Sequence, residues 1–137
     1  MREILFRGLR SYKNEWVEGF YKEVKGFHKD EKDLTWVTRS CIGDYEVNKE
    51  TVGQYTGFTD KNGTKVFEGD ILYAKYEDAQ DEKGYYEVYN EVVFKDGAFG
   101  LIGETTNDFL SFNYLPIVNE TVCGNIYDNP KLLDNIK

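Results

Sequence analysis

The sequence predicts a mainly β protein: a β-rich single domain over residues 1–137 with one or two short helices. Three observations predict this class. The length is that of one globular domain. The aromatic fraction is 16% within a hydrophobic fraction of 40%, enough to build a core and unlike a disordered chain. Short segments rich in aromatic and β-branched residues alternate with turns built from Gly, Asn and Asp. A barrel-like arrangement and two small sheets both fit this pattern.

The first third of the chain contains three expected strands. Residues 3–7 and 15–21 form the first two, joined by a polar turn over residues 11–14. Residues 34–38 are dense in β-branched and aromatic side chains and form the third. The intervening segment 22–33 is rich in charge, so we expect a solvated loop or a ragged hairpin there.

The middle of the chain carries the clearest turn signal. Asn62-Gly63 lies between the strand-like segments 54–58 and 64–67, and both residues tolerate positive φ, so a hairpin turn is expected. Residues 68–70 then turn the chain into a strand over 71–76. The polar run 77–84 is expected to form an exposed, mobile acidic loop.

The last third continues the β pattern and ends in a short helix. Residues 85–94 and 98–102 read as strands around a tight turn at 95–97, whereas 107–115 fits either a short helix or a strand. Asn129-Pro130 is typical of an N-cap followed by proline at the first helical position, which predicts a helix over 131–136.

The charge distribution argues against non-specific nucleic-acid binding. The formal net charge is -8; residues 1–69 hold 12 basic and 12 acidic side chains, and residues 70–137 hold 5 and 13. An acidic chain repels nucleic acid at long range. A local contact through the basic N-terminal segment (Arg2, Arg7, Arg10 and Lys13) remains open, because such fields are screened within about 10 Å.

Cysteine content and hydropathy point to the cytoplasm. Cys41 and Cys123 do not make a disulfide framework, so we expect reduced thiols, and with His28 they lack the ligand spacing of a zinc site. No run approaches the ~18 apolar residues of a membrane span, and the first residues lack the apolar block of a signal peptide.

No catalytic constellation stands out. The only histidine, His28, would need an orienting carboxylate and a serine nucleophile, and Ser11, Ser40 and Ser111 lie outside any nucleophile-elbow pattern. Glycine-rich nucleotide-binding motifs are also missing from the sequence. We therefore expect no catalytic residue and no cofactor.

Glu68 and Asp70 are the weak candidates for a metal site. Two residues apart on an extended chain, they would point to one side and could hold a divalent cation or exchange protons, with Asp60 or Asn62 nearby. The favoured interpretation is a turn in which Asp70 accepts a nearby amide N–H. A calcium loop around Gly63 fails, because its first and last acidic ligand positions fall on non-acidic residues.

The aromatic residues suggest an interface, since their number exceeds what a small core readily buries. Tyrosine is enriched in protein–protein contacts, although tyrosines on ordinary sheets also pack their rings and keep their hydroxyls hydrated. We take Tyr55, Tyr85 and Tyr86 as interface candidates. The full set is Tyr55, Phe58, Tyr73, Tyr76, Tyr85, Tyr86, Tyr89, Phe99, Phe109, Phe112 and Tyr114.

Several blocks together resemble the YopX family of small proteins from phages and prophages of Gram-positive bacteria. The central block is QYTGFTDKNG at 54–63 followed by VFEGDIL at 66–72, and the family pattern is similar. The opening REILFR at 2–7, VFKDGAFGL at 93–101 and GNIYDNPKLL at 124–133 match in family order. Segment 11–33 and the acidic loop depart from the pattern, and GLR at 8–10 replaces the expected continuation of the first strand.

The resemblance implies a phage-encoded cytoplasmic protein with a mainly β fold and carries over no catalytic residue. Our first hypothesis is a non-enzymatic accessory protein that forms a homo-oligomer and can bind a basic host or phage protein. The alternatives are a metal-binding protein or enzyme that uses Glu68 and Asp70, and a nucleic-acid-binding module that uses the basic N-terminal strand.

Overall fold

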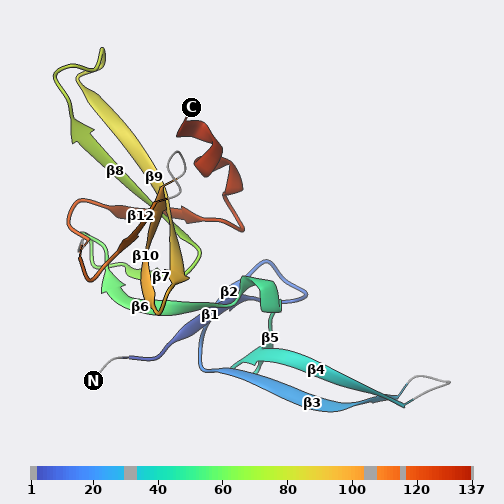
Figure 1. Cartoon of the computed structure of the whole chain (residues 1–137). Helices are drawn as coiled ribbons and strands as arrows, with labels where there is room; N and C mark the ends of the chain where they lie inside the picture. Colours follow the sequence, from blue (N-terminus) through green and yellow to red (C-terminus); the bar gives the residue numbers. More distant parts are fainter. Residues whose placement is uncertain (1–2, 30–33, 104–107, 115–116, 137) are drawn as a thin grey trace. The chain divides into compact units, whose positions relative to one another are not determined.

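A computed structural model describes residues 3–29, 34–103, 108–114 and 117–136. It confirms the mainly β class. The helices within the described residues are short 3-10 helices. The chain forms two compact units, Met1–Tyr55 and Thr56–Lys137, and the single domain over 1–137 stays a prediction. The two units are described separately below (Figure 1).

The first unit contains a small antiparallel sheet and a ribbon. Strand β1 (Phe6–Leu9) pairs with β2 (Trp16–Gly19) and with the first residues of β6 (Gly53–Thr59). The 3-10 helix η1 (Lys49–Thr51) precedes β6. The expected strand at 3–7 is therefore shifted toward its C-terminal side, and the segment 15–21 is divided between β2 and the next strand.

For the charge-rich segment 22–33 we expected either a solvated loop or a ragged hairpin. Where the structure describes this segment, it belongs to a hairpin. Strand β3 (Tyr21–Lys29) pairs along its full length with β4 (Leu34–Ile42), and β5 (Tyr45–Glu46) pairs with the last two residues of β4. Charged residues form strands readily when each has a cross-strand neighbour, and a local reading of composition does not detect this.

The base of the first unit is packed closely. Ile42 and Val47 are almost fully buried, and a Cβ added at Gly8 would lie 3.1 Å from a carbon of each. The Leu9 N–H donates to the Thr51 hydroxyl at 2.9 Å, and that hydroxyl donates to the Asn48 carbonyl at 2.6 Å. These contacts tie β1 to the segment before β6.

The second unit is built on a five-stranded antiparallel sheet in the order β11-β10-β9-β8-β12. Its strands are β8 (Asp70–Glu77), β9 (Tyr85–Lys95), β10 (Ala98–Gly103), β11 (Phe109–Ser111) and β12 (Thr121–Asn125). The ambiguous segment 107–115 is thus a strand where it is described. Strand β7 (Lys65–Phe67) precedes this sheet, and the 3-10 helix η2 (Pro130–Ile136) follows it, where a short helix over 131–136 was expected.

The core of the second unit joins the sheet to β7. Its buried members are Val66, Leu72, Val92, Phe99 and Phe112, against which Phe58 and other half-buried residues pack. The rings of Phe58 and Phe112 lie 5.2 Å apart. Three of the aromatics in the expected interface set therefore belong to the core. No helix among the described residues is long and apolar enough to cross a membrane.

Gly100 allows β10 and β11 to approach each other. A Cβ added at this position would overlap the Leu110 carbonyl oxygen and lie 2.8 Å from Phe109 Cε1. We expect Gly100→Ala to lower the free energy of unfolding by about 1–3 kcal/mol, because backbone must shift to admit the methyl group. Urea unfolding measures the loss. Gly26→Ala is the control, since its Cβ meets nothing within 4 Å; an equal loss in both variants would contradict this explanation.

Candidate functional site

The Asp60 carboxylate connects two parts of the second unit. Its Oδ1 accepts the N–H groups of Asn62 and Thr64, both at 2.9 Å, and this fixes the turn that Asn62-Gly63 predicted. Its Oδ2 accepts the N–H of Val122 in β12, also at 2.9 Å. The turn and β12 are therefore joined through one side chain.

The charge of Asp60 is part of this arrangement. Burial of the side chain would raise the pKa of its carboxyl, but the hydrogen bonds from the Val122, Thr64 and Asn62 backbone outweigh burial, and the pKa lies below its ordinary value. The fold therefore stabilises the ionised form. Asp60, in the sequence block 54–63, joins the turn to β12.

Asp70 also accepts a backbone hydrogen bond. Its Oδ2 receives the N–H of Phe67 at 2.7 Å, and the residue is 1% exposed, whereas Glu68 is half-buried. This is the contact that the turn interpretation of 68–70 predicted. No group of three His, Cys, Asp or Glu side chains suited to a metal ion occurs within the described residues.

The turn at 68–70 meets the end of β12 and the segment after it. Asn125 pairs with Asp70, and the Ile126 N–H donates to the Gly69 carbonyl at 2.9 Å. Gly69 has φ of 91°, and a Cβ there would lie 3.3 Å from the Tyr127 ring. Only glycine combines this backbone conformation with so close a ring. Two of the sequence blocks thus pack against each other.

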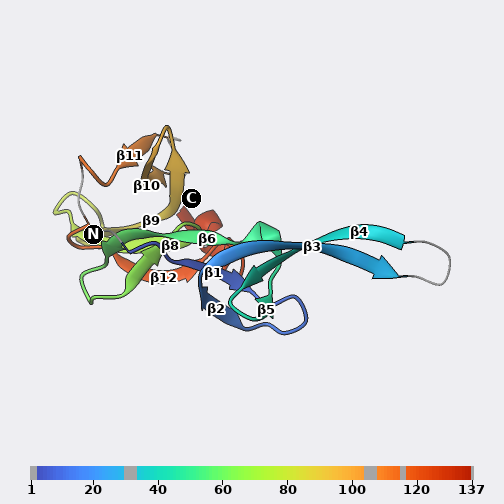
Figure 2. The same cartoon turned by 90° about the horizontal axis from the view of Figure 1, so that it is seen from below.

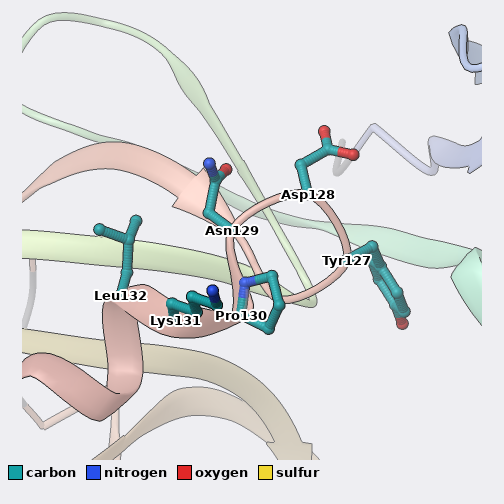
Figure 3. A pocket seen from close by; sticks show the side chains of 6 residues that line it. All are labelled: Tyr127, Asp128, Asn129, Pro130, Lys131 and Leu132. Carbon is teal, nitrogen blue, oxygen red and sulfur yellow. The ribbon is translucent and has the colours of Figure 1, made fainter.

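An open hollow of about 550 Å³ lies at the start of η2. All its lining residues come from one stretch, 127–132 (Figure 3). No second segment of the described chain brings a side chain to it. Asn125 stabilises this turn by accepting the N–H groups of Tyr127 and Asp128 at 3.0 and 2.9 Å. The hollow is therefore the shape of a turn rather than a site of converging polar groups.

The described residues contain a different candidate surface on β8 and β9. Among the described residues the two strands continue beyond their sheet neighbours, because the pairing of β12 with β8 ends at Tyr73 and that of β10 with β9 ends at Asn90 (Figure 1). We call the extension, residues 73–77 with 85–89, the tyrosine ribbon.

One face of the tyrosine ribbon combines tyrosines with charge. Tyr73 and Tyr89 are direct cross-strand neighbours with ring centroids 5.2 Å apart. Lys75 lies opposite Glu87, and its Nζ is 3.9 Å from the centre of the Tyr85 ring. The Lys75 amino group therefore lies against an aromatic face, and the Tyr73 hydroxyl donates a hydrogen bond to the Glu87 carboxylate.

The other face of the tyrosine ribbon carries a second tyrosine pair. Tyr76 and Tyr86 are stacked, with centroids 5.4 Å apart and planes at 29°. The Tyr76 hydroxyl donates to Glu120 at 3.1 Å, and Tyr86 is 46% exposed. Ordered, half-exposed tyrosines of this kind offer large contact area at low entropic cost.

Three hydroxyls of the tyrosine ribbon, those of Tyr73, Tyr76 and Tyr89, stay protonated at neutral pH. Burial raises the pKa of Tyr73, Tyr76 and Tyr89, and nearby carboxylates (Glu87 or Glu120) raise each further. The surface therefore presents neutral hydroxyls together with a few charged side chains.

The three interface candidates from sequence lie in different surroundings. Tyr85 is half-buried and Tyr86 is exposed, both on the tyrosine ribbon, but Tyr55 is only 8% exposed and offers little surface. Sequence analysis missed Lys75 and Glu87, whose positions beside Tyr85 and Tyr73 depend on the β8–β9 register. The alternation of aromatic and charged residues at 73–77 and 85–89 was the available signal.

The remaining candidates have ordinary structural roles where they are described. The Arg7 guanidinium lies 4.9 Å from the Trp16 ring centre; that of Arg10 lies 4.2 Å from the Tyr45 ring and 3.5 Å from Glu15. Arg2 and the side chain of His28 lie outside the described part of the chain. Both cysteines are free.

The acidic loop at 77–84 is exposed as expected. Asp78 and Asp81 each accept a backbone N–H two residues ahead at 2.9 Å, and the Asp78 N–H donates to the Gly84 carbonyl at 3.0 Å. Successive turns therefore close the end of the tyrosine ribbon.

Comparison with known proteins gives a family and a fold neighbour. The family model described as "YopX protein" matches residues 5–134. The structure is similar to the crystal structure of protein EF1440 from Enterococcus faecalis, with a TM-score of 0.56 and 25% sequence identity. The likeness covers 97% of this chain and 99% of that one. A comparison with curated proteins gave no match.

Asp60 should make stability depend on pH. A carboxyl with a lowered pKa in the folded state stabilises the fold above its unfolded pKa of about 3.9, and that contribution is lost as pH falls through the folded value. We expect Asp60→Asn to lower the free energy of unfolding at pH 7 by about 1–3 kcal/mol. On acidification, the free energy of unfolding of this variant should fall by less than that of the wild type. Urea unfolding at pH 7 and below pH 4 checks both effects; parallel pH curves would contradict the role of the charge.

The turn interpretation of Glu68 and Asp70 predicts no response to divalent cations. Because Asp70 is buried and accepts the Phe67 N–H, millimolar Mg²⁺, Mn²⁺ or Ca²⁺ should leave the melting temperature unchanged. Thermal unfolding with each chloride, with matched NaCl as the control for ionic strength, makes the measurement. A rise that Glu68→Gln removes would instead establish a carboxylate metal site.

Proposed function

Because the chain belongs to the YopX family, we propose that it is a phage- or prophage-encoded accessory protein, a non-enzymatic protein–protein interaction module that forms a homo-oligomer in the bacterial cytoplasm. The tyrosine ribbon is the observation that carries this proposal. It combines Tyr73, Tyr76, Tyr85, Tyr86 and Tyr89 on two strands that extend past their neighbours.

A two-stranded ribbon without a partner has little stability of its own. Such a ribbon is marginally stable in water, and its free edges are templates for pairing with another chain. A ribbon covered by a partner gains buried aromatic area and loses the exposed edge. Tyrosine suits this role because its ring packs while its hydroxyl remains a hydrogen-bond donor.

Charge supports a basic partner in addition to a second copy. The first unit carries ten basic and ten acidic residues, whereas the second carries seven and fifteen. The acidic loop closes the tyrosine ribbon, so a basic host or phage protein would be attracted toward that end. The two free cysteines are compatible with a reducing compartment.

The double variant Tyr85→Ala/Tyr86→Ala tests the surface. If both rings contact a partner, we expect association to weaken by about tenfold or more, because truncated interface aromatics cost more than 1 kcal/mol each. Light scattering after size-exclusion chromatography gives the mass at several concentrations, and thermal unfolding confirms that the variant is folded. Tyr114→Ala is the matched control, since Tyr114 is 88% exposed and lies in a turn. Unchanged mass and binding in a folded double variant would remove these tyrosines from the interface.

A further inference from the structure

Strand β3 presents a long free edge in the first unit. It is the terminal strand in the order β3-β4-β5, and among the described residues its backbone ladder is formed with β4 alone. Figures 1 and 2 both show β3 and β4 continuing side by side past β5. Because β5 pairs only with Cys41 and Ile42, most of this ribbon has two strands.

The side chains near the middle of this edge face solvent. Lys22, Glu23, Val24 and Lys25 are all exposed, and Val24 is a large apolar side chain with 45% of its surface in contact with water. A free edge of this length is usually protected, and lysine is the common protecting residue. Here Glu23 lies between Lys22 and Lys25, so in one pairing register the side chains that face each other across the two copies carry opposite charges.

Two identical strands pair antiparallel about a two-fold axis perpendicular to the sheet. One residue then faces its own copy on the axis, and residues equally far from it on either side face each other reciprocally. An axis at residue 22, 23 or 25 sets Lys against Lys or Glu against Glu at the centre. An axis at Val24 sets Glu23 against the copy's Lys25, twice, and brings the two Val24 side chains together.

We propose that a second copy of this chain docks on the β3 edge in the register centred on Val24, forming a continuous four-stranded sheet β4-β3-β3-β4. The inference rests on the proposed function in assuming self-association, and it assigns a contact between copies, separate from any that the tyrosine ribbon makes, to one edge and one register. Backbone hydrogen bonds along the edge supply affinity, and the two Glu23–Lys25 pairs select the register.

Glu23 is already positioned for this pairing. Its Oε1 accepts the Tyr21 hydroxyl at 3.1 Å and lies 3.3 Å from Lys49 Nζ. The hydrogen bond from Tyr21 lowers the pKa of this carboxyl, and Lys49 lowers it further, so it is ionised at neutral pH. Lys25 lies on the same face of β3, because the two residues are two positions apart.

Charge exchange tests the register. In Lys25→Glu the pairs become Glu against Glu, so we expect the dimer dissociation constant to rise about tenfold or more. In Glu23→Lys they become Lys against Lys, with the same effect. An equimolar mixture of the two variants should form a heterodimer of near wild-type affinity, because each Glu then faces a Lys. Sedimentation equilibrium and native mass spectrometry measure the constants and the composition.

Lys22→Glu is the matched control. It makes the same charge change as Lys25→Glu three residues earlier and on the opposite face, where its partner would be Gly26, so the dimer dissociation constant should change less than threefold. Circular dichroism checks that each variant is folded. A dimer that persists unchanged in Lys25→Glu, or a mixture without heterodimer, would overturn the β3 register and leave self-association standing. A wild type that stays monomeric would overturn both.

Discussion

The carboxylates of Asp60 and Asp70 hold the second unit together, because each accepts backbone N–H groups from a segment outside its own strand. Asp60 joins the turn after β6 to β12 through Val122, and Asp70 joins the start of β8 to β7 through Phe67. Buried carboxylates that accept several amides are strong and specific contacts. The central sequence motif is therefore explained by architecture: it places β8 between β9 and β12, from which the tyrosine ribbon extends.

The backbone hydrogen bonding at strand edges links this architecture to the proposed function. In the part of the chain that the structure describes, the pairing of β12 and β10 ends before the ends of β8 and β9, and β5 pairs with β4 only at Cys41 and Ile42. Both units thus contain a two-stranded extension, and such extensions gain most from a partner strand or surface. Aromatic side chains dominate the tyrosine ribbon, which suits it to packing against a partner. Charged side chains of both signs dominate the β3 edge, which suits it to selecting one pairing register.

Local chemistry predicted much of this fold and little of its surface. The Asn62-Gly63 turn, the 68–70 turn and the strand at 71–76 were predictable because their signals lie within a few residues. The third acceptor contact of Asp60 was not, since Val122 lies 62 positions away. The length of β3 was not predicted, because its charged residues are typical of a solvated loop. The burial of Tyr55 was not predicted either, because it depends on tertiary packing, which the spacing of residues in the sequence does not determine. Tyr85 and Tyr86 were identified from composition, whereas the partners that order them required the register.

Sedimentation velocity of the intact wild-type chain, across a concentration series from about 0.1 to 100 μM, measures whether the protein self-associates. We expect a reversible shift from the 16.0 kDa monomer to a species of at least twice that mass as concentration rises. A single species at the monomer mass over the whole series would contradict the homo-oligomeric module.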